Sequence, residues 1–126
     1  MAATPYTQTN VNYDIVQALL NQQTVQDNIT AKAGGGQTTA TAVTATFVNI
    51  GVCATANDSV QLPLAVAGAS VFIRNNGAAS AQVYAANGST DTINGTAGST
   101  GVAQAASAGR VYFCTVSAPA GKWQST

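Results

Sequence analysis

The residues from Asp58 to Trp123 alternate short apolar runs with turn signals and carry very little charge. Asn-Gly pairs recur in this segment, and they favour tight turns because both residues tolerate a positive φ. They stand at Asn76-Gly77, Asn87-Gly88 and Asn94-Gly95. A chain that turns this often has room only for short strands, so the segment predicts a compact all-β body.

Alternation within the apolar runs predicts which side chains of these strands point to the same face of the sheet. In Val71-Phe72-Ile73-Arg74 the first and third residues point to one face and the second and fourth to the other. Asn75-Asn76-Gly77 then turns the chain into residues 81–85, which predicts a hairpin. With about seven or eight short antiparallel strands of this kind, residues 37–126 predict an antiparallel β-sandwich or a jelly-roll-like barrel.

A short helical arm is predicted ahead of this body. From Tyr13 to about Ile29 apolar residues recur at three- and four-residue intervals, which is typical of an amphipathic helix. Gly34-Gly35-Gly36 interrupts the chain afterwards, and three glycines favour a flexible joint. We therefore expect an arm at residues 1–36 and a body at residues 37–126. The apolar residues of the predicted helix form a narrow stripe on one side of it: Ile15, Val16, Leu19 and Leu20. To be stable, the helix must pack this stripe either on its own body or on another subunit.

The charge of the chain limits its partners. Among 126 residues only four are Lys or Arg and four are acidic, and the net charge is zero. A protein that binds nucleic acid through phosphates needs a cluster of cations, so nucleic acid is not an expected partner. Anionic membranes find equally little to bind. Met1 to Tyr6 lacks the basic and apolar regions of an export signal, and Leu62 to Ile73 is too short to span a bilayer.

The same composition argues against catalysis. The chain has no His and no Glu, and its four Asp residues show no spacing typical of an acid-base pair. We expect no enzymatic activity, no cofactor and no metal. Asp91-Thr92-Ile93-Asn94-Gly95 offers oxygen ligands for a hard cation, but a single carboxylate makes a weak site. A turn in which Asp91 accepts hydrogen bonds from backbone amides is the favoured interpretation.

Cysteine and tryptophan leave two further questions open. Cys53 and Cys114 lie in apolar runs, and without an export signal we favour buried free thiols over a disulfide. Trp123 either closes one end of the β-body or serves as a platform on which a sugar stacks.

Several phrases of the chain resemble a group of small virion proteins encoded by tailed bacteriophages. The resemblance spans about residues 32–123, and its motifs describe turns and core positions, so they are more specific for a fold than for a role. They are Ala33-Gly34-Gly35-Gly36-Gln37, Ala56-Asn57-Asp58-Ser59-Val60-Gln61-Leu62-Pro63, Val71-Phe72-Ile73-Arg74-Asn75-Asn76-Gly77, Asp91-Thr92-Ile93-Asn94-Gly95, Val111-Tyr112-Phe113-Cys114 and Gly121-Lys122-Trp123.

This resemblance implies a β-rich structural component of the virion. The expected role is a trimeric cement, or decoration, protein that binds the major capsid protein on the outside of the head and stabilises the lattice. The chain would be made in the cytoplasm of the host bacterium and end up on the capsid surface. The alternative is a spike or fibre component of the tail or head that binds a host receptor or glycan.

Candidate contact residues follow from this role. On the arm, the apolar stripe and two aromatic residues, Tyr6 and Tyr13, are candidates for a capsid or subunit interface, although the tyrosines also fit a disordered terminus. On the body, Arg74 and Arg110 stand out in a chain with so little charge. We expect them to pair with Asp58 or Asp91, within one subunit or between two.

Overall fold

The computed structural model describes residues 23–126, and within this range the chain forms eleven β-strands and no helix. The all-β prediction for the body is confirmed. The strands are β1 (Val25–Thr30), β2 (Thr41–Ala42), β3 (Phe47–Val52), β4 (Ser59–Gln61), β5 (Ser70–Asn75), β6 (Ala81–Tyr84), β7 (Thr92–Ile93), β8 (Thr96–Ala97), β9 (Val102–Gln104), β10 (Gly109–Val116) and β11 (Lys122–Ser125).

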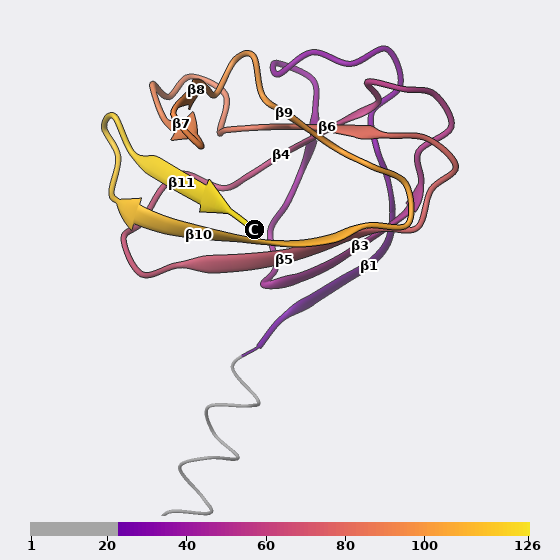
Figure 1. The fold of residues 1–126 in the computed structure, drawn as a ribbon, viewed down its shortest axis with the longest axis horizontal. Coiled ribbons are helices and arrows are strands. Elements are labelled where there is room, and N and C mark those ends of the chain that lie inside the picture. Colours follow the sequence, from indigo (N-terminus) through magenta and orange to yellow (C-terminus); the bar gives the residue numbers. More distant parts are fainter. Residues whose placement is uncertain (1–22) are drawn as a thin grey trace, which may run out of the picture.

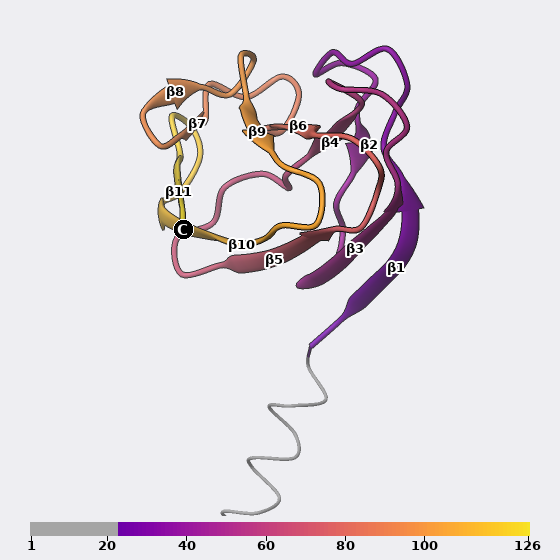
Figure 2. The same ribbon diagram turned by 45° about the vertical axis from the view of Figure 1, so that its right-hand side comes forward.

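The strands of residues 23–126 form two sheets that face each other. The larger sheet has seven strands in the order β1-β3-β5-β10-β11-β7-β8, and the smaller has four in the order β2-β4-β6-β9. Figure 1 shows β3, β5 and β10 along one side of the molecule and β4, β6 and β9 along the other. In Figure 2, β11, β7 and β8 lie at the end of the molecule away from β1, where the larger sheet bends toward the smaller one.

The first half of the body is a coil rather than a set of hairpins. From β1 to β6 the chain passes alternately through the larger and the smaller sheet. As a result, β1, β3 and β5 stack in parallel, and so do β2, β4 and β6. Each circuit lays one strand in each sheet, so equivalent positions form rows across the sheet. One such row joins Val25, Phe47 and Phe72.

The second half closes this coil with mostly antiparallel strands. β9 adds to β6, and β10 is the long strand between β5 and β11. A short β7–β8 hairpin, turned by Asn94 and Gly95 at positive φ, then pairs with β11 through β7. An Asn-Gly pair at this turn fits the prediction, since both residues adopt the left-handed region there.

Two sequence predictions are wrong in their details. The sheets are mixed, because β1, β3 and β5 and likewise β2, β4 and β6 pair in parallel, so the sandwich is not the antiparallel one expected. The hairpin expected around Asn75-Asn76-Gly77 does not form, because β5 belongs to the larger sheet and β6 to the smaller. The turn instead packs on the preceding circuit: a Cβ on Gly77 would lie 2.5 Å from the backbone nitrogen of Cys53.

The predicted helix also ends too late. The helix was expected to run to about Ile29, but Val25–Thr30 form β1, whose Val, Ile and Thr side chains suit a strand. Asn28 has a φ of 53°, and the register of β1 on β3 shifts beside it. The rest of the predicted helix, from Tyr13 onward, lies outside the described residues.

The triple glycine lies inside the described body, between β1 and β2. All three glycines have positive φ, at 87°, 69° and 88°. Hydrogen bonds tie the loop to the smaller sheet: the amide of Gly34 donates to Asp58 Oδ1, and Ser59 Oγ donates to the carbonyl of Gly36. Because β1 precedes these glycines and pairs with β3, the described β-structure begins at Val25 rather than after Gly36.

A buried polar network holds the two sheets together at the core. Gln104 on β9 donates from Nε2 to the carbonyls of Ile73 and Ala108, and its Oε1 accepts a hydrogen bond of 2.9 Å from the Tyr112 hydroxyl. Asn75 donates to the carbonyls of Ala79 and Gln104. Since every amide group in this network has a partner, its burial costs little stability. The apolar core around it includes Val48, Ile50, Val60, Leu62, Val71, Ile73, Val83, Ile93 and Trp123.

Candidate interaction surface

The buried aspartates are structural acceptors. Asp58 Oδ2 accepts hydrogen bonds from the amides of Ala54 and Thr55, each at 3.1 Å. Asp91 accepts from the amides of Ala65, at 3.1 Å, and Gly121, at 2.8 Å. Asp91 therefore binds backbone amides as expected, but they belong to distant loops rather than to its own turn. Within residues 23–126, no three His, Cys, Asp or Glu side chains gather to form a metal site.

Neither arginine meets the buried aspartates. The exposed Arg74 donates from Nε to Asn76 Oδ1 at 3.0 Å, and the half-buried Arg110 donates to the carbonyl of Ala103 at 3.1 Å. The pairing expected within one subunit, with Asp58 or Asp91, is therefore wrong, because backbone amides already occupy both carboxylates. The remaining predicted contact residues lie outside the described range: Tyr6, Tyr13, Ile15, Val16, Leu19 and Leu20.

Both cysteines are buried free thiols, as predicted. Burial raises the pKa of the Cys53 thiol, and the nearby Asp58 carboxylate raises it further. A thiol with a raised pKa forms little of the nucleophilic thiolate at neutral pH. Cys53 is thus a core residue rather than a reactive one.

Trp123 closes the core and presents no face to solvent. Its exposed fraction is 0%, and it lies on β11 opposite Cys114. Its indole Nε1 is buried without a hydrogen-bond partner among the described residues. The interpretation of Trp123 as a platform for sugar stacking is therefore wrong for this structure, since stacking needs an accessible ring face.

The most unusual surface is the outer face of the larger sheet. Val25, Phe47, Phe72 and Val111 form one row across four neighbouring strands, β1, β3, β5 and β10. Val25 is 72% exposed and Phe47 is 46% exposed. The rings of Phe47 and Phe72 pack at a centroid distance of 6.3 Å, in a tilted arrangement. We call this row, together with Phe113 on β10, the apolar row.

A polar chain runs beside the apolar row on the same face. Asn49 donates from Nδ2 to Asp27 Oδ1 at 2.8 Å, and Asn76 donates from Nδ2 to Asn49 Oδ1 at 2.6 Å. Arg74 then donates to Asn76, which completes a chain of four side chains. The chain has a carboxylate at its β1 end and a guanidinium at its β5 end. Between it and the apolar row lies a shallow groove of about 170 Å³.

Sequence alone identified only part of this surface. The alternation in β5 places Phe72 and Arg74 opposite the core residues Val71 and Ile73, as the structure confirms. Phe47 and Val25 were not predicted to join them. The sequence did show a change in the apolar alternation at Phe47 and Val48, and in the structure Phe47 faces outward and Val48 inward. The parallel order of β3 and β5, which places Phe47 beside Phe72, was not predicted.

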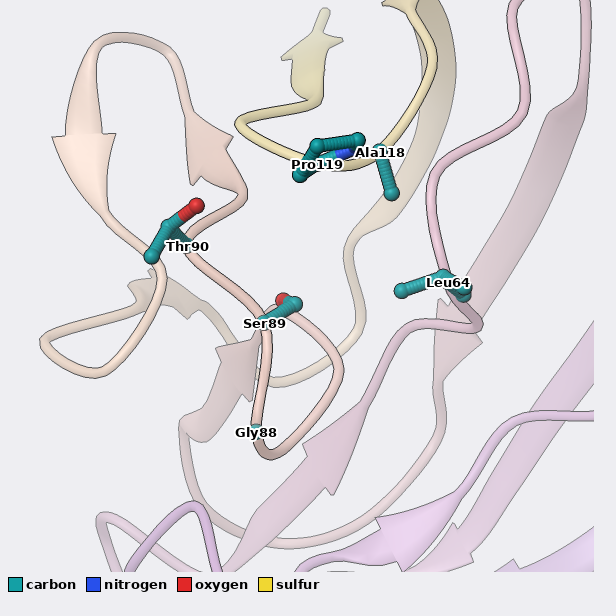
Figure 3. A pocket seen from close by; sticks show the side chains of 6 residues that line it. All are labelled: Leu64, Gly88, Ser89, Thr90, Ala118 and Pro119. Atoms are coloured by element: carbon teal, nitrogen blue, oxygen red, sulfur yellow. The ribbon is translucent and has the colours of Figure 1, made fainter.

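A separate hollow of about 430 Å³ lies at the other end of the body. Figure 3 shows the residues around it, which come from loops between strands. Its hydroxyl groups are already engaged, since Ser89 Oγ donates to the carbonyl of Ala86 and Thr90 Oγ1 accepts from the amide of Ala120. Its lining has no titratable side chain: Leu64, Gly88, Ser89, Thr90, Ala118 and Pro119. The hollow therefore has no ionisable side chain, and the hydroxyl groups in its lining already form hydrogen bonds within the protein.

Residues 23–126 include no helix that is long and apolar enough to cross a membrane. No family model matches the chain, and no curated protein or solved structure is significantly similar to it.

Proposed function

We propose that the chain is a non-enzymatic structural protein of a bacteriophage virion, a trimeric cement protein that binds the major capsid protein on the outside of the head. The observation that carries the proposal is the set of phage-like motifs over residues 32–123, set in a body with almost no charge. The two facing sheets serve in this proposal as a sandwich-like body, and the residues before β1 serve as a helical arm.

The chemistry of the described residues agrees with such a role. Both buried carboxylates bind backbone amides, and the thiols are buried, so these groups stabilise the fold. A cement protein acts by adding buried contact area at lattice seams, and three linked copies raise avidity beyond that of one contact. The glycan-binding alternative has lost its main support, because Trp123 is buried.

A binding experiment with capsids tests the proposal. Heads assembled without this chain are mixed with the purified full-length protein, sedimented, and analysed for bound copies. We expect saturation at a fixed ratio to the major capsid protein and a higher temperature of head disruption. Sedimentation of heads with no bound protein, at any concentration tested, would contradict the proposal.

A truncation then asks which part makes the contact. The cut belongs after residue 22, because Val25 to Thr30 form a strand of the sheet. We expect the truncated chain to keep its fold, shown by an unchanged midpoint of urea unfolding, and to lose head binding. Full binding by the truncated chain would assign the contact to the body instead.

A further inference from the structure

We infer that the outer face of β1, β3 and β5 is the surface through which one copy of this chain binds another. The inference rests on the proposed function only for the number of copies, three. The face itself is argued from the apolar row and from the polar chain beside it.

The apolar row gives this face a reason to be covered. Val25 is 72% exposed and Phe47 is 46% exposed, in a chain that has only three Phe residues. The opposite sides of these strands carry the core residues Val48 and Ile73, which are fully packed. A contiguous exposed apolar surface with a polar border is typical of a protein contact site.

The polar chain identifies the partner as another copy. Asp27 ends it with a negative charge on β1, and Arg74 ends it with a positive charge on β5. Within residues 23–126 the only side-chain hydrogen bonds of these two groups go to Asn49 and Asn76. A partner with charge of one sign matches only one end, whereas a second copy supplies the complement of both.

Geometry allows both charges to be matched at once. Neighbouring strands lie about 4.8 Å apart, so Asp27 and Arg74, two strands apart, are separated by about 10 Å across β3. When copies are related by a rotation axis that runs along β3, β1 of one copy lies beside β5 of the next. Asp27 then meets Arg74 of the neighbouring copy, and the Phe47 side chains meet near the axis.

The proposed function sets the number of copies at three. In a ring of three, each contact joins Asp27 of one copy to Arg74 of the next, so every copy has both of its charges matched.

Charge reversal tests the inference directly. The full-length chain, Asp27→Arg and Arg74→Asp are compared by sedimentation equilibrium over a range of concentrations. Each single variant places like charges in contact, so we expect its self-association to weaken about tenfold or more. The double variant Asp27→Arg/Arg74→Asp restores an opposite pair at every contact of the ring, and it should regain the affinity of the original chain. Lys122→Asp, at an exposed position of β11, makes the same charge change as Arg74→Asp and should have no effect.

The outcomes separate this inference from the proposed function. A monomeric full-length chain, or single variants that associate as tightly as the original, would overturn the inference. Phe47→Ser gives an independent check and should also weaken association. If the full-length chain sediments as a dimer and the charge variants weaken that dimer, the result supports this face as the contact surface and contradicts the trimer. Tight association without binding to heads contradicts only the proposed function.

Discussion

Replacement of the buried Asp91 side chain should strongly destabilise the fold. This side chain is 1% exposed, and its carboxylate accepts hydrogen bonds from the amides of Ala65, after β4, and Gly121, before β11. The same residue accepts a bond of 3.0 Å at its backbone carbonyl from the amide of Gly98. Three loops that are far apart in the sequence therefore meet at Asp91.

The expected loss of stability follows from the two backbone amides that donate to the Asp91 carboxylate. Asp91→Ala leaves both buried N–H groups without an acceptor, and each such loss costs about 1–3 kcal/mol. We therefore expect the free energy of unfolding to fall by about 2–6 kcal/mol, a large part of the about 5–15 kcal/mol typical of a domain. Asp91→Asn keeps one acceptor oxygen, so its loss should be smaller, about 1–3 kcal/mol.

Urea unfolding followed by tryptophan fluorescence measures these losses. Trp123 is the one tryptophan in the sequence and is fully buried, so its emission reports on global unfolding. Ser99→Ala, at an exposed position of the same region, is the matched control and should change stability by less than about 0.5 kcal/mol. If Asp91→Ala is as stable as this control, the assigned role of the carboxylate is wrong.

Three further predictions concern the core. Gly77→Ala places a Cβ 2.5 Å from the backbone nitrogen of Cys53, so it should lower the free energy of unfolding by about 1–3 kcal/mol, measured in urea. Burial raises the pKa of Tyr112 to about 12, whereas an unfolded tyrosine titrates near 10. The unfolded state therefore loses this proton first, and stability should fall by up to about 3 kcal/mol from pH 10 to 12, a loss that Tyr112→Phe should remove from the pH profile. Cys53 and Cys114 should react with a thiol reagent only after unfolding, and rapid labelling of the native protein would contradict their burial.

Side-chain alternation predicted the strands well but not their partners. The pattern of β5, with Val71 and Ile73 inside and Phe72 and Arg74 outside, is found as expected. Alternation has the same period of two in parallel and antiparallel sheets, so it cannot distinguish a hairpin from a coil. Gly77 packs closely on Cys53 of the preceding circuit, and side-chain alternation carries no information on such a contact.

The error at β1 has a similar cause. Ile29 was expected to lie near the end of the predicted helix, but it pairs with Ile50 on β3. The amide of Ala31 also donates to the carbonyl of Val52, which continues the pairing beyond the strand. Tertiary pairing of this kind overrides a local helical period, because packing outweighs propensity over a short segment.

The sequence predicted only part of the candidate surface, because strand pairing determines the rest. Phe72 and Arg74 were placed together on one face by the alternation of a single strand. Val25, Asp27 and Phe47 join them through the parallel order of β1, β3 and β5. That order is a property of the folded coil, so the sequence did not reveal that Asp27 and Arg74 lie at the two ends of one polar chain.

A reconstruction of a phage head with and without the full-length chain tests the proposed function most directly. We expect added density on the outer surface, at fixed lattice positions, in groups of three copies whose larger sheets face a common axis. Identical maps with and without the chain, or density confined to the tail, would contradict it.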